Sequence, residues 1–413
     1  MVNVRETKQA FENALLNKDP HRLTQVFELP IGGPGPLSST TTTRGGLQPR
    51  KHNPQSFTVD GKDCGGLLTS LLDAYAAAEV GNIEATFEAQ IKVHPKFNQL
   101  FSSSEGNWMV PAMIAVCKNT HKLGLEADRQ AMSESKTKQN HHTKLQKAVP
   151  ILQESYSKTF NDRTEYQPGA LFDTSGSKQA GVLAIVNELF GMYFRLNILR
   201  LCKNLIRPVE TKKLSEKGSM AEMVTYKYYI GRLSMFEDDH ARAETNLEYA
   251  LEHCHKDATN NKKRILKYLV PVKLYRGKLP TAHLLNKYGL EEFKPLVEGM
   301  RKGDLRTFQD GLVQYQDRFI RQGTYLLLEK CKTVVYRNLF KRVWKIIGSH
   351  QIKLEHITKA FKWLGMPIDL DEMECILANL IFKRYIKGYL SHAMRTLVLS
   401  KRDPFPTSAV ISK

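Results

Sequence analysis

The sequence predicts a mainly α-helical fold: a right-handed α-solenoid of tetratricopeptide-like helix pairs, followed by a C-terminal winged helix. Two observations lead to this prediction. Through most of the 413 residues, apolar side chains recur three and four positions apart, as they do along one face of an amphipathic helix. Alternation typical of strands appears only in the last fifth of the chain, where it follows several helical segments.

The first 60 residues are expected to form one helix and a flexible segment. Phe11 and Leu15 lie four positions apart within residues 3–18, which predicts a helix with both side chains on one face. Residues 29–56 are rich in Gly, Pro, Ser and Thr, and such a composition cannot bury enough apolar surface to offset chain entropy. We therefore treat residues 1–60 as a separate N-terminal region.

Residues 61–320 show the recurring pattern of a helical repeat. An apolar helix, a short polar turn and a second helix follow one another, and the turns at Asn197, Asp239 and Lys278 are about forty residues apart. This spacing is typical of helix pairs that stack into solenoids, whose extended concave surfaces generally bind other molecules. Two loops are expected to interrupt this region, at residues 128–144 and 161–179.

One helix pair fits the repeat best. Gly231 and Ala243 are small at the offsets where the two helices of a tetratricopeptide-type hairpin approach each other closely. A stripe of residues three or four positions apart is expected to be buried in the second helix: Ala243, Leu247, Ala250 and Cys254. The other pairs match more loosely, so the prediction is a degenerate solenoid rather than a regular repeat array.

Residues 321–403 have the element order of a winged helix. The expected elements are a long helix over 324–349, a strand over 351–354, a helix over 355–365, a helix that Asp369 caps, and strands over 387–392 and 395–401. Gly365 is a usual residue just past the end of a helix, and aspartate is a usual N-cap. Residues 404–413 are expected to be a tail.

The composition favours an intracellular protein that does not enter a membrane. The six cysteines form no CxxC pair and suggest no disulfide framework, which favours the reduced thiols of the cytosol or nucleus. The N-terminus carries early charges and lacks the apolar core of a signal peptide. No apolar run approaches the length of a membrane-spanning helix.

Positive charge is concentrated in the predicted winged helix. The chain has 61 Lys and Arg against 42 Asp and Glu, a net charge of +19, so we expect a polyanion or an acidic protein as partner. Residues 321–402 hold 16 Lys and Arg against six Asp and Glu, a net charge of +10. In winged helices the third helix and the wing can approach a nucleic-acid backbone, where charge supplies affinity.

The candidate nucleic-acid-binding residues lie along the long helix, at the end of the third helix and around the wing. They are Arg337, Lys341, Lys345, Lys383, Arg384, Lys387, Arg395, Lys401 and Arg402. Two aromatic residues, Tyr385 and Tyr389, are candidates for stacking on unpaired bases. The wing strands also leave an edge that can extend the sheet of a neighbouring protein.

Several stretches resemble those of a known family. They are "VTYKYYIGRLSMF" (224–236), "EHCHK" (252–256), "KRILKYLVPVKL" (263–274), "YRNLFKRVW" (336–344), "ECILANLIFKRYIKGYLSH" (374–392) and "LVLSKRDPFP" (397–406). A helical-repeat arm that ends in a winged helix is the PCI architecture of proteasome-lid, COP-nine-signalosome and initiation-factor subunits. These stretches resemble the PCI-domain-containing protein two family, which includes the signalosome-subunit-twelve-like proteins. The resemblance covers residues 180–410 and is much weaker over residues 1–175.

This resemblance implies a non-catalytic scaffold subunit of a nuclear complex that couples transcription to messenger-RNA export. It implies two protein partners, a larger PCI-bearing scaffold subunit and a very small acidic proteasome-lid-type protein, with RNA or another nucleic acid as a further ligand. The nucleus is the expected location, with the cytoplasm as a second one. The alternative is a pure protein-interaction subunit, associated with the COP-nine signalosome or with a splicing-linked PCI heterodimer.

The sequence "LEHCHKD" invites a metal-site interpretation, which its spacing does not favour. Neighbouring side chains on a helix point about 100° apart, so His253, Cys254 and His255 cannot converge on one tetrahedral ion. Metalloprotease subunits of related complexes follow His-x-His with a serine and an aspartate, but Lys263 and Leu266 stand at those positions. We therefore expect a helix end with a buried cysteine, and no catalytic residue, metal or cofactor.

Overall fold

A computed structural model describes residues 4–29, 58–59, 62–134, 142–167 and 172–406. These residues are mainly helical, which confirms the predicted fold class. The chain divides into two compact units, Met1–Tyr226 and Lys227–Lys413, with the boundary inside one helix. Apart from Leu29, the segment 29–56 for which we predicted flexibility lies outside the described residues.

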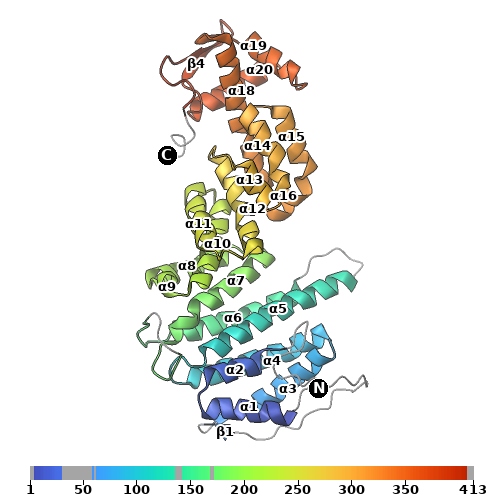
Figure 1. The fold of residues 1–413 in the computed structure, drawn as a ribbon, viewed down its shortest axis with the longest axis vertical. Helices are drawn as coiled ribbons and strands as arrows, with labels where there is room; N and C mark the ends of the chain where they lie inside the picture. The colour runs from blue at the N-terminus through green and yellow to red at the C-terminus, as the bar shows by residue number, and fades with distance from the viewer. Residues whose placement is uncertain (1–3, 30–57, 60–61, 135–141, 168–171, 407–413) are drawn as a thin grey trace. The chain divides into compact units, whose positions relative to one another are not determined.

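The first unit consists of packed helices and one small hairpin (Figure 1). Its helices are α1 (Val4–Leu16), α2 (Pro20–Phe27), α3 (Gly65–Glu79), α4 (Ile83–Ser103), α5 (Val110–Glu134), α6 (Thr143–Phe160), the 3-10 helix η1 (Lys178–Gly181), α7 (Val182–Leu196), α8 (Arg200–Thr211), α9 (Leu214–Lys217) and the start of α10 (Met220–Phe236). The predicted N-terminal helix is confirmed as α1, where Phe11 and Leu15 are both buried.

The hairpin of the first unit was not expected, because strand-like alternation was predicted only near the C-terminus. Strands β1 (Thr58–Val59) and β2 (Lys62–Asp63) pair antiparallel. Each strand has only two residues, and a pattern with a period of two cannot be recognised over so short a length. The missed hairpin immediately precedes α3.

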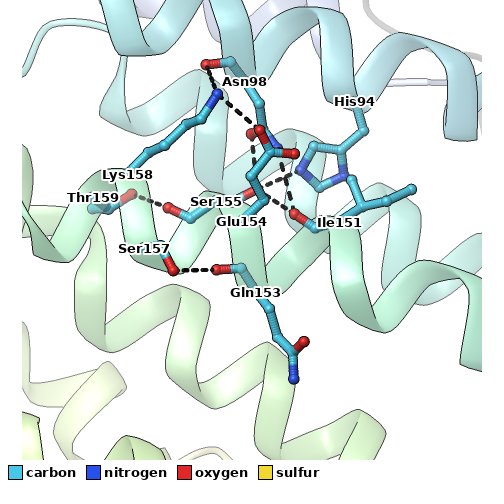
Figure 2. Close-up of polar contacts among 9 residues, drawn as sticks. All are labelled: His94, Asn98, Ile151, Gln153, Glu154, Ser155, Ser157, Lys158 and Thr159. Atoms are coloured by element: carbon cyan, nitrogen blue, oxygen red, sulfur yellow. Dashed lines mark hydrogen bonds and ion pairs between the residues drawn. The ribbon is translucent and has the colours of Figure 1, made fainter.

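A buried polar cluster joins α4, α5 and α6 in the core of the first unit, and Figure 2 shows the members that α4 and α6 contribute. One ring nitrogen of His94 lies 2.9 Å from the Thr120 hydroxyl, and the other lies 2.9 Å from the Ser155 hydroxyl. Ser155 donates to the side-chain oxygen of Asn98 at 2.8 Å. All four side chains are fully buried, so each needs these partners to offset the cost of leaving water.

Burial of His94 predicts that the first unit loses stability in acid. Because the charged imidazolium would be desolvated, the pKa of His94 is lowered to about 3. The unfolded chain binds a proton at the ordinary histidine pKa of about 6.5, so stability falls as the pH drops below that value. From pH 7 to pH 5, the free energy of unfolding should fall by about 2 kcal/mol more in the wild type than in His94→Gln. Urea unfolding of both proteins across this range measures the difference, and parallel pH profiles would refute the assignment.

The second unit continues with helix pairs and ends in a small sheet (Figure 1). After α10 come α11 (His240–His253), α12 (Thr259–Tyr275), α13 (Ala282–Lys287), the 3-10 helix η2 (Glu291–Phe293), α14 (Lys294–Lys302), α15 (Leu305–Gln314) and α16 (Gln316–Gln322). The C-terminal elements are α17 (Tyr325–Lys330), α18 (Lys332–Ile347), β3 (Gln351–Lys353), α19 (Leu354–Trp363), α20 (Leu370–Phe382), β4 (Gly388–Ser391) and β5 (Thr396–Leu399).

The α10–α11 pair packs as the sequence predicts. The expected stripe of α11, formed by Ala243, Leu247, Ala250 and Cys254, is buried. A Cβ atom built on Gly231 of α10 would lie only 2.6 Å from the Leu247 Cγ atom. The missing side chain therefore allows the two helices to approach closely, and Asp239 caps α11 by accepting a hydrogen bond from the Arg242 amide at 3.0 Å.

The winged-helix order is confirmed, with one correction. The three strands form an antiparallel sheet in the order β3-β5-β4, and Tyr389 of the wing pairs with Val398. The long helix expected over 324–349 is instead broken into α17 and α18 at Cys331. There the amide of Cys331 donates a hydrogen bond to the carbonyl of Leu328, three residues earlier. This tight turn interrupts the α-helical hydrogen bonding.

Candidate nucleic-acid interface

The third helix and the wing are covalently and spatially continuous. Helix α20 ends at Phe382, and the amides of Tyr385 and Ile386 fold back to the carbonyl of Leu380. This turn requires a left-handed backbone at Arg384, with φ of 61°. The turn leads directly into β4, so the cations that close the helix lie at the base of the wing.

Most of the predicted binding residues are exposed. The exposed members are Lys345, Lys383, Arg384, Lys387, Arg395, Lys401 and Arg402, and Lys341 is half-buried. Lys387 lies 3.8 Å from the carboxylate of Asp403. Asp403 also acts electrostatically on Lys341, which indicates that the two lysines share one neighbourhood at the base of the wing.

Positive side chains crowd around Lys341 on α18. Its pKa is lowered, first by partial burial and then by the positive charges of Arg337 and Lys345. Asp403 offsets only part of this repulsion. An anion bound beside Lys341 would relieve it, so this part of the surface is electrostatically suited to a phosphate.

Arg337 does not belong to this surface, and the sequence prediction is wrong there. Only 8% of the residue is exposed. One terminal nitrogen of its guanidinium donates to the carbonyls of Phe405 and Pro406 at 2.8 and 2.7 Å, and the other donates to the side-chain oxygen of Asn338 at 2.7 Å. The C-terminal segment 404–406 folds back over this side chain, so Arg337 is not available to a phosphate.

Arg395 is separated from the other candidates by the length of the wing. Arg395 is the last residue of the β4–β5 turn, whereas Lys387 precedes β4, and the four residues of that strand span about 13 Å. At this end of the wing, His392 contacts the carboxylate of Glu374 on α20 at 2.7 Å. The structure therefore places the cations at two sites, one at the base of the wing and one at its tip.

The two tyrosines proposed for base stacking have different surroundings. Tyr389 is 62% exposed on β4 and can offer its ring to a base. Tyr385 is only 7% exposed, so the prediction that its ring stacks on a base is wrong. The same burial raises the pKa of its phenol to about 12. Two exposed apolar side chains that the sequence reasoning missed, Phe382 and Met394, lie at the end of α20 and at the wing tip.

The histidines of "LEHCHKD" lie at the end of a helix, as predicted. Helix α11 ends at His253, whose ring stacks on Tyr249 with centroids 4.0 Å apart, and Cys254 is buried. His255 lies instead 3.6 Å from Asp257 in the turn that follows. Within the part of the chain that the structure describes, no group of three His, Cys, Asp or Glu side chains is placed to hold a metal ion.

None of the described helices is long and apolar enough to cross a lipid bilayer.

The winged helix and its preceding helices match the PCI domain over residues 312–401. This match includes α18, α20 and both wing strands, and thus all but the last of the candidate cations.

Curated relatives match most of the chain. PCI domain-containing protein 2 of Xenopus laevis is 38% identical over 338 residues, which cover 81% of this chain and 82% of the relative. Enhanced ethylene response protein 5 of Arabidopsis thaliana is 37% identical over 350 residues, covering 83% and 81%. Protein CSN12 homolog of Mycosarcoma maydis is 29% identical over 352 residues, covering 79% and 76%. The resemblance predicted from the sequence is therefore confirmed, and the chain belongs to the PCI domain-containing protein 2 family of PCI scaffold proteins.

Proposed function

We propose that this protein is a nuclear PCI scaffold subunit that couples transcription to messenger-RNA export and contacts RNA through its winged helix. One observation carries the RNA contact: seven exposed cations lie on α18, at the end of the third helix and around the wing, and Arg337 alone of the nine predicted residues is buried. Charge of this kind binds phosphates with little dependence on base sequence. Exposed Tyr389 adds a surface on which a base can stack.

The sheet supports a lateral contact with another PCI subunit. In the order β3-β5-β4, strand β4 forms an edge whose outer backbone groups can pair with a further strand. We propose a larger PCI-bearing scaffold subunit as the partner at this edge. A very small acidic protein is the second proposed partner, and the net charge of +19 favours its association.

Reversing four charges of the winged helix is expected to weaken RNA binding. The variant carries Lys341→Glu, Lys345→Glu, Lys383→Glu and Arg384→Glu, and its Kd for a single-stranded RNA should rise at least tenfold at 0.1 M salt. Because each lost phosphate contact removes about 0.7 from the salt slope of a single strand, that slope should fall by about 2 to 3. Fluorescence anisotropy of the full chain, and of the chain bound to its PCI partner, measures both quantities. An unchanged slope in the assembled complex would reject RNA contact by this surface.

A pure protein-interaction subunit is the second candidate function. The exposed apolar side chains of the winged helix favour it, since Trp363, Phe382 and Met394 are each more than 70% exposed. Affinity purification followed by mass spectrometry separates the two functions. Recovery of signalosome or splicing subunits without export factors would support this alternative and reject the proposed role in export.

A further inference from the structure

A second basic surface lies on α12, outside the PCI domain match. Its cations are Lys262, Lys263, Arg264 and Lys267, of which Arg264 is exposed and the three lysines are half-buried. Lys263, Arg264 and Lys267 lie within about 100° of one another around the helix, whereas Lys262 points at least 100° away from each of them. Every aliphatic residue of α12 is buried. Since four residues of a helix rise about 6 Å, Lys263 and Lys267 present their charges one turn apart along a continuous face.

The charge of this surface is not neutralised by the fold. Residues 258–290 include eight Lys and Arg and no Asp or Glu. Three of these cations are paired, since Lys273 contacts Glu248, and Arg276 and Lys278 contact Glu244. Among the described residues, no carboxylate lies within ion-pair distance of the four cations named above.

An acidic group that acts on this surface is already engaged. Glu292 is fully buried, and its carboxylate lies 3.3 Å from the guanidinium of Arg318. Glu292 also attracts Lys267, but the pKa of Lys267 is lowered, first by burial and then by the charges of Arg318, Lys263 and Arg264. The α12 face thus carries a surplus of positive charge that one buried carboxylate does not offset.

The start of α12 adds no negative charge to this surface. Helix α12 begins at Thr259, has no acidic residue in its first turn and has no side-chain cap. The dipole of a helix acts mainly on its first turn, and Lys262, Lys263 and Arg264 follow the first three residues of α12. Acidic side chains within the helix therefore do not offset their positive charges.

The chemistry of the face favours a nucleic acid over a protein. The centres of protein–protein interfaces are apolar and depleted in lysine, whereas nucleic-acid interfaces are polar and strongly positive. The exposed residues that border the cations on α12 are Thr259, Asn260 and Asn261, which are polar, and no aliphatic side chain is exposed among them. We infer that the α12 face is a second RNA contact, which binds the sugar–phosphate backbone of a single strand and extends the footprint of the winged helix.

This inference rests on the proposed function only in taking RNA as the ligand, and it can be tested separately. The test variant carries Lys262→Glu, Lys263→Glu and Arg264→Glu, and because glutamate forms helices about as well as lysine and arginine, α12 should remain folded. The control carries Lys92→Glu, Lys118→Glu and Arg200→Glu, which reverses three exposed cations on different helices of the first unit. The probe is a fluorescein-labelled uridine homopolymer of thirty nucleotides, titrated with full-length protein at several salt concentrations.

The α12 variant should bind this probe at least tenfold more weakly at 0.1 M salt, with a salt slope smaller by about 2, while the control stays within twofold of the wild type. A second variant, Lys263→Arg with Lys267→Arg, keeps the charge and should bind like the wild type. If only the winged-helix variant weakens binding, the α12 inference is overturned and the proposed function stands. If the wild type does not bind, both are overturned. If the α12 variant lost binding only to labelled poly-glutamate and bound the uridine probe like the wild type, the face would be assigned to an acidic protein and RNA contact would be rejected.

Discussion

Replacing Arg337 by alanine should lower the free energy of unfolding of the second unit by about 3–5 kcal/mol. The substitution removes the donors of the carbonyls of Phe405 and Pro406, and each buried carbonyl left without a partner costs about 1–3 kcal/mol. It also leaves a space under the C-terminal segment, where the Phe405 ring lies 5.7 Å from that of Trp344. Urea unfolding followed by tryptophan fluorescence measures the loss.

Two further variants show whether the role of Arg337 is structural. Lys345→Ala, two turns later on α18 and exposed, should change stability by less than about 0.5 kcal/mol. Arg337→Lys keeps the charge but cannot hold two carbonyls in a planar fork, so it should recover only part of the stability. If Arg337→Ala reduced the salt slope of RNA binding and left stability unchanged, Arg337 would be assigned to the RNA-binding surface and its structural role would be rejected.

Arg337 illustrates why the candidate site could be only partly predicted. Positions 337, 341 and 345 are equivalent by helical spacing, and each lies beside the apolar stripe of α18. What separates them is a contact with residues 405 and 406, nearly seventy positions later in the chain. Periodicity describes one helix and cannot show which of its polar positions a distant segment will cover.

Features that depend on neighbouring residues were predictable. The helix boundaries at Gly365 and Asp369 follow from capping chemistry within a few residues, and the structure shows both. The break at Cys331 has no proline or glycine to signal it, and the sequence there reads as one continuous helix. The α12 face did have a local sequence signal, because residues 258–290 contain no Asp or Glu. We considered nucleic-acid binding only for the charge of the winged helix, and α12 lies outside that region.

Gly303→Ala is expected to be the most destabilising single-methyl change at the junction between the helical repeat and the winged helix. Gly303 ends α14 with φ of 63°, and a Cβ atom there would lie 2.5 Å from the Leu339 amide nitrogen on α18. The left-handed conformation costs alanine about 1 kcal/mol, and overlap with a backbone that cannot rotate away adds about 1–3 kcal/mol. The free energy of unfolding should therefore fall by about 3 kcal/mol.

Gly348 provides a matched control for this prediction. It ends α18 with φ of 71°, but a Cβ atom there would have nothing within 4 Å, so Gly348→Ala should cost only about 1 kcal/mol. The difference between the two variants isolates the contact of α14 with α18. Asn338 reinforces this contact by donating to the Met300 carbonyl at 2.7 Å. Equal costs at the two glycines would contradict the close packing. A larger cost at Gly303 would show that the winged helix is anchored on the helical repeat, so that both basic surfaces belong to one folded unit.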